Sequence, residues 1–526
     1  MRVLPFLLVT AALTTHGAIR AEPAGAPAPG DFARSPDLPD DTPAEIEAEL
    51  LRQSPVTSLA EALRRTYWSN PTLLAQRAAT RGVDYRVPQA RAAYGPRLGA
   101  TATYGWQSDA FEITPGQYSR QEGWASTAQA VLTQPLITFG RGAAGEQFAL
   151  AQLDYQRNVL RSGENQALLD AITAYVGVLR DRDGVAIAQD NLTLLEQELR
   201  DNQQRLKVRE VTATDLQQVE TRVELGRAQL LSARRAAAGS EAAFLRTIGA
   251  PAGQAAAPPN PLALPVRTLE EAYGFAESNN PALFAAKARE KASRAQVASA
   301  RADLRPRVDL RGSAEYGTIS PYSSDLRRNT LRGEVQLTAP LYEGALRTSR
   351  LAELQAANDA DWRLLDAAFR DNRAALADIW SEWQAQAGAV DRYAAAVDSA
   401  RKAYDGALLQ ERAGLRTTLD VLDLARELLS ARTAYNSAVA NVTVAKARVL
   451  FAMGSLDYGW LQPDADRYDA DLHFRRVRSR GDLPLLTPLI RAIDRSVAGS
   501  ANDRPLRDPA ALSETAGMTV EPEGDR

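Results

Sequence analysis

Apolar and polar residues alternate with a period of two in four segments of about ten residues, the length of a tilted strand that crosses a bilayer. The clearest segment spans residues 307–316, where apolar or small residues occupy the even positions and mostly charged or polar residues the odd ones. Residues 330–339 and 97–106 repeat the pattern, and residues 123–133 repeat it more weakly. Successive side chains of a strand point to opposite faces, so the pattern predicts four strands with one apolar face.

Two environments fit such strands, a membrane and the surface of a soluble core. Charged residues on one face and aromatic residues near the strand ends favour the membrane, where aromatic side chains form belts at the interfaces. The candidate belt residues are Tyr104, Trp106, Trp124, Tyr316 and Tyr322. Four strands cannot close a barrel, and open strand edges in lipid leave costly unpaired amides. If the strands span a membrane, several chains must combine them, and three copies would give twelve strands.

The rest of the chain predicts helices, two of them very long. Proline is absent from about residue 142 to 206 and from about residue 346 to 412. Each stretch would form a helix of about 100 Å at a rise of about 1.5 Å per residue. Apolar residues recur every seven positions within residues 376–407 and 421–449, which indicates a coiled-coil seam. The chain is expected to turn back at residues 208–213 and 413–416.

Shorter helices are expected at about residues 58–92 and 268–302, ahead of the strands. Asn70-Pro71 and Asn280-Pro281 interrupt them early, because proline breaks a helix. These two motifs are 210 residues apart (280 − 70), whereas Asp215 and Asp420 are 205 apart (420 − 215). The chain therefore contains two copies of one unit, and we expect the five extra residues of the first copy in its hairpin loop, around residues 110–120.

The duplication and the composition of the ends divide the chain into six parts. Residues 1–21 have the charged start and apolar run of a secretory signal, with an ordinary hydrophobic helix as the alternative. The polar C-terminal extension, which contains much Pro, Gly, Asp and Arg, is expected to be poorly ordered, apart from a short amphipathic helix within residues 483–493. In order, the parts are a signal peptide (1–21), a Pro/Ala-rich linker (22–56), the first repeat (57–250), a second linker (251–266), the second repeat (267–455) and a periplasmic C-terminal extension (456–526).

Composition argues against an enzyme. The chain of 526 residues has no cysteine, which removes disulfides, thiolate nucleophiles and cysteine-based zinc sites. Its two histidines, His16 and His473, both lie outside the repeats. The formal net charge of −3 gives no field that would attract nucleic acid. We therefore expect no catalytic residue, no metal site and no cofactor.

The motifs of the two copies together resemble those of the TolC-type outer membrane channels. The resemblance covers about residues 57 to 455, and no single motif would be specific. It rests on the paired Asn-Pro motifs, Gln134-Pro135-Leu136 with Phe139-Gly140, residues 339–344 (Ala-Pro-Leu-Tyr-Glu-Gly), and Ala413-Gly414 leading into residues 419–423 (Leu-Asp-Val-Leu-Asp).

The resemblance implies an α+β membrane protein that works as a homotrimer. Each chain would supply four strands to one twelve-stranded barrel in the outer membrane, and its long helices would form a periplasmic α-helical barrel. A periplasmic adaptor protein and an inner-membrane ABC transporter or proton-driven pump would dock at the helical tip. The channel would export proteins, by type I secretion, or small toxic compounds. A periplasmic coiled-coil scaffold without a channel is the alternative.

Asp420 and Asp423 are candidate pore residues, because residues three apart share one face of a helix. The family's acidic rings match these two positions, and rings of carboxylates favour cations and can bind a blocking metal ion. The alternative for Asp420 is local, since an Asp in the first turn stabilises a helix, and Thr417 or Thr418 resembles its N-cap.

The resemblance also implies a gate latch and a docking surface at the tip. In the family, an arginine at the position of Arg416 links to residues at the positions of Asp215 and Thr214 and holds the tunnel shut. The alternative is a solvated arginine beside a turn. Glu411 replaces the family's gating tyrosine and is expected to pair with Arg416 instead. The expected docking residues are Val208, Arg209, Ala413, Gly414 and Leu415, where Arg209 replaces a family glycine.

Overall fold

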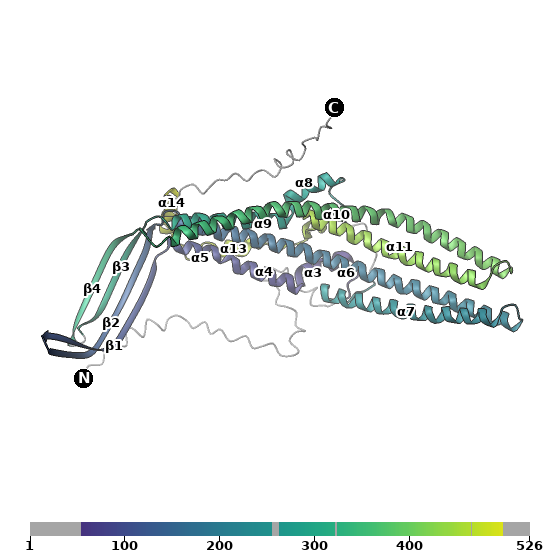
Figure 1. Cartoon of the computed structure of the whole chain (residues 1–526), viewed down its shortest axis with the longest axis horizontal. Helices are drawn as coiled ribbons and strands as arrows, with labels where there is room; N and C mark the ends of the chain where they lie inside the picture. The colour runs from purple at the N-terminus through teal and green to yellow at the C-terminus, as the bar shows by residue number, and fades with distance from the viewer. Residues whose placement is uncertain (1–53, 255–261, 321–322, 464, 498–526) are drawn as a thin grey trace, which may run out of the picture.

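The computed structural model describes residues 54–254, 262–320, 323–463 and 465–497. The predicted signal peptide (1–21), nearly all of the first linker, and Tyr322 lie outside these residues. The molecule is elongated, with the strands at one end and two pairs of long helices reaching away from them (Figure 1). Among the described residues, none of the helices combines the length and the apolar character that a membrane-spanning helix needs.

The four strands form one antiparallel sheet in chain order, β1-β2-β3-β4, and leave β1 and β4 as its edges. All four are longer than the sequence pattern predicts. Their bounds are β1 Arg97–Thr114, β2 Gln117–Ile137, β3 Arg307–Ser320 and β4 Ser323–Thr338.

The five extra residues of the first copy lengthen its strands. Arg97 pairs with Thr133, 36 positions away (133 − 97), whereas Arg307 pairs with Thr338, 31 positions away (338 − 307). The first hairpin therefore does contain the insertion, but the expected larger loop is wrong. Pairing continues through Thr114 and Gln117, and only two residues make the turn. Gly116 allows this turn because its φ is +86°, which side chains disfavour.

Rows of paired residues give the sheet one apolar and one polar face, as the period-two pattern predicts. Along a row, side chains of adjacent strands point to the same side. One apolar row consists of Leu98, Leu132, Gly312 and Gly333, and the next of Ala100, Ala130, Ala314 and Leu331. The polar rows between and beside them include Arg97, Thr133, Arg311 and Glu334, and then Thr101, Gln129, Glu315 and Thr330.

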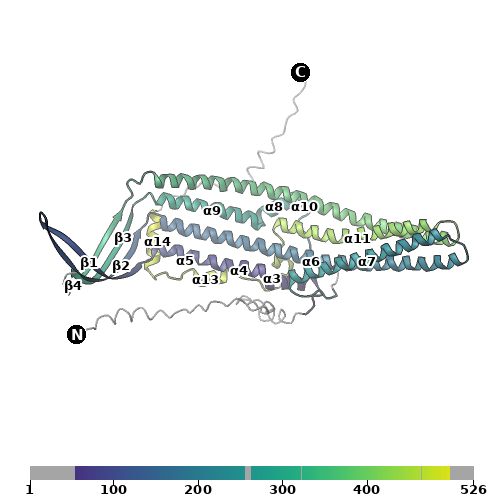
Figure 2. The same cartoon turned by 60° about the horizontal axis from the view of Figure 1, so that its bottom comes forward.

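The long helices α6 (Arg141–Lys207) and α10 (Leu346–Arg412) have 67 residues each, close to the predicted spans. The shorter α7 (Ala213–Ile248) and α11 (Thr418–Met453) return along them, and Figure 2 shows the two hairpins side by side. The remaining helices of the repeats are α3 Leu59–Ser69, α4 Pro71–Asp84, α5 Arg86–Arg91, the 3-10 turn η2 Ala92–Tyr94, α8 Leu269–Asn279 and α9 Pro281–Ala302.

Each Asn-Pro motif ends one helix and begins the next. The Asn70 side chain accepts from the backbone N–H of Thr72 at 3.0 Å, and Asn280 accepts from that of Ala282 at 2.8 Å. The following proline loses nothing at the first helical position, where its absent N–H would be unpaired in any case. The Asn280 amide also donates to the carbonyl oxygen of Ala452 at 2.8 Å, which ties this break to the end of α11.

In the C-terminal extension, residues 456–463 and 465–497 include three helices that pack on the first repeat, so the expected poor order is wrong for these residues. The extension forms α12 (Tyr458–Leu461), α13 (Ala470–Val477) and α14 (Leu486–Val497). Its aromatic side chains pack on the first repeat. Tyr458 stacks on Tyr67 with ring centroids 4.1 Å apart, and the buried Arg77 lies over the rings of Tyr67 and Tyr468.

Candidate functional site at the helical tip

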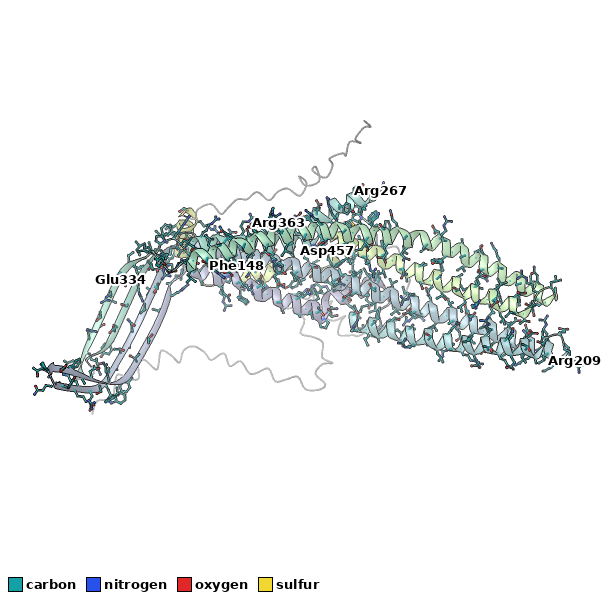
Figure 3. The ribbon with its side chains drawn as sticks, in the orientation of Figure 1. Phe148, Arg209, Arg267, Glu334, Arg363 and Asp457 are labelled. Atoms are coloured by element: carbon teal, nitrogen blue, oxygen red, sulfur yellow. The ribbon has the colours of Figure 1, made fainter. Side chains whose placement is uncertain are left out.

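The tip consists of two turns that carry the expected docking residues. Arg209 has φ +58° in the first turn, and Gly414 has φ +73° at the equivalent place in the second. Arginine therefore adopts the left-handed conformation that glycine favours, and the two turns share one backbone shape. Val208, Arg209, Ala413, Gly414 and Leu415 are all exposed. Figure 3 shows Arg209 at the far end from Glu334 of the sheet.

Each returning helix begins with the same capping box. Thr212 caps α7, and the carboxylate of Asp215 accepts from the Thr212 backbone N–H at 2.9 Å and hydroxyl at 2.7 Å. Thr417 caps α11 and is bound by Asp420 in the same way, at 3.2 and 2.9 Å. These hydrogen bonds hold the pKa of both aspartates below the ordinary range, since they stabilise the charged form.

The two candidate ring residues are exposed in the first turns of α11. Asp423 pairs with Arg222 of α7 at 3.2 Å and lies 3.7 Å from Arg426. Asp420 has its local capping role, and the Arg416 charge makes a smaller contribution to lowering its pKa. Arg416 and Thr214 are themselves exposed.

Glu411 pairs with Arg205 of α6, so the expected pairing with Arg416 is wrong. The Arg205 Nη1 atom donates to the Glu411 carboxylate, and Nη2 donates to the Glu411 carbonyl oxygen at 3.2 Å. The Glu411 side chain is only 5% exposed and that of Arg205 24%. Arg205 extends from the first hairpin, so this buried contact joins the two hairpins directly.

Further polar side chains surround this pair and form what we name the tip cluster: Glu198, Asn202, Arg205, Glu411 and Thr418. The Asn202 amide donates to the Glu198 carboxylate at 2.9 Å. The Thr418 hydroxyl lies 3.3 Å from the Asn202 side-chain oxygen and 3.4 Å from the Glu411 carboxylate. All five members are buried except Arg205, which is half-buried. The cluster fills the space between α6 and the second hairpin.

Electrostatics in the tip cluster are unbalanced, with two carboxylates and one guanidinium. Burial raises the pKa of Glu198, and the nearby Glu411 charge raises it further, while the Asn202 hydrogen bond opposes the shift. Burial, followed by the charge of Glu198, also raises the pKa of Tyr404 to about 12. Protonation of Glu198 therefore favours the packed arrangement of the hairpins.

Apolar contacts flank the cluster. Leu422 of the second hairpin packs with Leu192, Leu195 and Val219 of the first. Arg432 of α11 also lies 3.6 Å from Asp190 of α6. Together with the tip cluster, these contacts pack the two hairpins against each other near the tip. Separation of the hairpins would have to break them.

Sequence reasoning missed Glu198, Asn202 and Arg205, and it named Thr418 only as an alternative N-cap to Thr417, which is the observed cap. The first three lie at spacings of four and three, on one face of α6, where the apolar seam is interrupted. Polar residues at helical spacing on an otherwise apolar helix face indicate a buried polar contact with another helix. They do not identify the partner, because Glu411 lies 206 positions from Arg205 in the sequence.

Comparison with known proteins gives consistent matches. A family model described as outer membrane efflux protein matches residues 62–250 and 272–455. The outer membrane efflux protein BepC of Brucella suis is 27% identical over 425 residues, which cover 80% of this chain and 91% of BepC. The alkaline protease secretion protein AprF of Pseudomonas aeruginosa is 27% identical over 390 residues, which cover 72% of this chain and 80% of AprF.

A solved structure shares the fold. The outer membrane protein VceC of Vibrio cholerae superposes with a TM-score of 0.65 at 18% identity, covering 77% of this chain and 96% of VceC. The prediction of an α+β chain with duplicated strands and long helices is therefore confirmed, as is the resemblance to TolC-type channels.

Proposed function

Because the chain belongs to the outer membrane efflux protein family, we propose that three copies form one channel, gated at the helical tip, that exports cargo across the outer membrane. The family comprises transport channels and is not a family of enzymes, and its members lie in the outer membrane. The observation that carries the proposal is a sheet with one apolar face, one polar face and two open edges, at the opposite end from exposed hairpin turns.

The sheet supports assembly into a barrel. Edge strands β1 and β4 leave backbone groups that need partners, and lipid offers none. Pairing β4 of one copy with β1 of the next satisfies both edges, and three copies close at twelve strands. The apolar rows then face lipid and the polar rows line the pore, which is the alternation found in barrels that carry water.

The helical part supports a tunnel made by several copies. Within a single chain, the predicted seam is buried near the tip at Tyr404 and Val421 but open farther along, where Tyr393 and Tyr435 are exposed. Coiled-coil positions are normally covered by a facing helix. Neighbouring copies would cover these side chains and continue the wall around a central bore.

We place the gate at the tip, where both hairpins meet. The tip cluster holds the hairpins of one chain together. Arg416 and Thr214 are exposed and Asp215 is partly exposed, so a neighbouring copy can reach all three. Three copies of Asp420 and Asp423 would form two acidic rings across the constriction. Opening then requires separation of the hairpins and rupture of the Arg205–Glu411 contact.

The exposed turns are the proposed docking surface for a periplasmic adaptor. Val208, Arg209, Ala413, Gly414 and Leu415 present one shape twice in each chain, so a trimer offers six similar tips. An inner-membrane ABC transporter or a proton-driven pump would energise export. The names of the relatives include both efflux and protease secretion, so protein and small-molecule cargo both remain within the proposal.

Fractionation and conductance together test this function against the scaffold alternative. We expect the protein to stay in the outer membrane after a high-salt wash and to run as a heat-modifiable trimer. Reconstituted into a planar bilayer, it should conduct, and Arg416→Ser with Asp215→Ala should open it further. Release from the membrane by salt, together with no conductance even from the double variant, would support a scaffold instead.

A further inference from the structure

Helix α14 turns apolar side chains outward. Leu485, just before the helix, is 87% exposed, and Leu489 is 59% exposed. Leu486 and Ile493 continue this outward surface. A surface helix of a soluble protein normally shows the reverse pattern, with its apolar stripe against the core. Exposed apolar patches on a stable fold mark a binding surface.

The inward side of α14 is fixed by polar contacts. The buried Asp494 accepts from the Thr138 hydroxyl at 2.7 Å, from the Gly140 backbone N–H at 2.9 Å and from that of Ala143 at 3.1 Å. Asp494 thereby caps the start of α6, where the positive end of the helix dipole favours a carboxylate. The helix therefore cannot roll to bury its leucines without losing this cap.

A second anchor lies one turn along α6. Glu146 is fully buried and accepts hydrogen bonds from Arg491 at 2.8 Å and from Arg495 at 3.2 Å. Arg91 of α5 binds the same carboxylate at 3.0 Å. Three guanidinium groups around one buried carboxylate hold α14 in a single orientation, with Leu489 on the outside.

A basic segment adjoins the helix. Arg475, Arg476, Arg478 and Arg480 are all exposed, and Arg475 also pairs with Asp469. The carbonyl oxygen of Arg478 accepts from Arg91 Nη1 at 2.6 Å, which ties the segment to the Glu146 anchor. A run of arginines beside an outward apolar helix is the composition of elements that lie on anionic membranes.

The position of α14 also fits a membrane surface. It packs at the junction where β2 ends and α6 begins, as Figures 1 and 2 both show. The apolar rows of the sheet end at this level. Strand β2 is an inner strand, whereas the copies would join along β1 and β4. Through the contact of Asp494 with Thr138, α14 is held beside an inner strand at the helical end of the sheet.

We propose that residues 475–497 bind the periplasmic leaflet of the outer membrane. Leu485, Leu489 and Ile493 would enter the boundary between headgroups and acyl chains, and the four arginines would contact the phosphates of anionic phospholipids. The segment would thus hold the channel at a set depth, as an anchor separate from the barrel. This inference rests on the proposed insertion of the strands.

Single cysteine variants test it cleanly, because the chain has no cysteine of its own. We would label Leu489→Cys with an environment-sensitive fluorophore in the full-length protein, reconstituted in phosphatidylcholine–phosphatidylglycerol vesicles. Leu331→Cys, on the apolar face of the sheet, is the lipid-facing reference, and Val208→Cys, at the tip, is the aqueous reference. Lipids with a nitroxide near the headgroup serve as the quencher.

We expect the label at 489 to show blue-shifted emission and to lose fluorescence to the lipid nitroxide, while the label at 208 does neither. Changing the four arginines to glutamine should reduce that loss in vesicles with phosphatidylglycerol and leave it unchanged in pure phosphatidylcholine. A label at 489 that is shielded from water but not quenched by lipid would assign the surface to a second copy and overturn the inference. A water-exposed label at 489 would overturn it too. Failure at 331 as well would refute the proposed strand insertion itself.

Discussion

Arg205→Ala is the substitution that we expect to open the tip most directly. It removes the guanidinium from the tip cluster and leaves the Glu411 carboxylate buried near Glu198, without the cation that pairs with it. Separation of the hairpins would return both carboxylates to water. The variant therefore destabilises the closed tip more than the open one.

The size of the effect follows from the burial of the pair. Removing one partner of a buried ion pair costs about 3–5 kcal/mol. The Glu411 side chain is only 5% exposed, but Arg205 keeps 24% of its side-chain surface in water, and this lowers the cost. We take about 2 kcal/mol per subunit, which changes the ratio of closed to open tips about 30-fold, since about 1.4 kcal/mol is tenfold.

Single-channel recording in planar bilayers measures this ratio. Arg205→Ala should raise the open fraction strongly, and Arg205→Ala with Glu411→Gln should recover much of the closed state, because no unpaired charge then remains at position 411. Arg200→Ala is the matched control, on the same helix with an exposed side chain. If Arg205→Ala behaves like Arg200→Ala, the tip cluster does not hold the gate and the reasoning fails.

Three further predictions address the acidic rings, the pH response of the tip and the cap that Asp494 of α14 forms on α6. Asp420→Ala with Asp423→Ala should weaken the block of current by divalent or trivalent cations, and an unchanged block would remove the ring assignment. Glu198 faces Glu411, Asp201, Arg205 and Tyr404, and its pKa is raised in the closed tip. Protonated Glu198 therefore stabilises the closed tip fully below pH 4.5, and this stabilisation is lost as the pH rises through the raised pKa. The open fraction should accordingly increase with pH over that range in the wild type and stay flat in Glu198→Gln, with Glu196→Gln as the control that keeps the response. Asp494→Ala should lower the free energy of unfolding by about 1–2 kcal/mol, because α6 loses its cap. Chemical denaturation measures this difference, with Asp471→Ala as the control. Equal stability of the two variants would contradict the capping role of Asp494.

The sequence alone predicts the repeated architecture well, because its signals are local. The Asn-Pro motifs mark helix breaks through their own hydrogen bonds, and the long proline-free stretches predict α6 and α10 nearly to the residue. The strands are underestimated because polar residues such as Asp109 and Glu122 continue the ladder beyond the apolar pattern. In the first hairpin, hydrogen bonds between the two backbones continue the strands beyond the point where the side-chain pattern indicates them.

The candidate site is predictable only in part, since its central contact is long-range. Thr417 and Asp420 are three positions apart, and a capping box is visible from that spacing alone. The partner of Glu411 depends on how two hairpins from different repeats pack, which brings Arg205 rather than the sequence neighbour Arg416 to it. The packing of α13 and α14 onto the first repeat likewise depends on buried partners that are distant in the sequence. One of them is Asp84, which pairs with His473 at 2.6 Å.

The central claim is that three sheets close into one pore lined by their polar rows. The most direct test uses two neighbouring residues of β1, Thr101 on the polar face and Ala100 on the apolar face, each changed to cysteine in the cysteine-free chain. During single-channel recording, a charged thiol reagent is added from the aqueous phase. The account predicts that the current of Thr101→Cys falls in three equal steps, one per subunit, while that of Ala100→Cys does not change. Equal responses of the two variants, or a single step at Thr101→Cys, would contradict it.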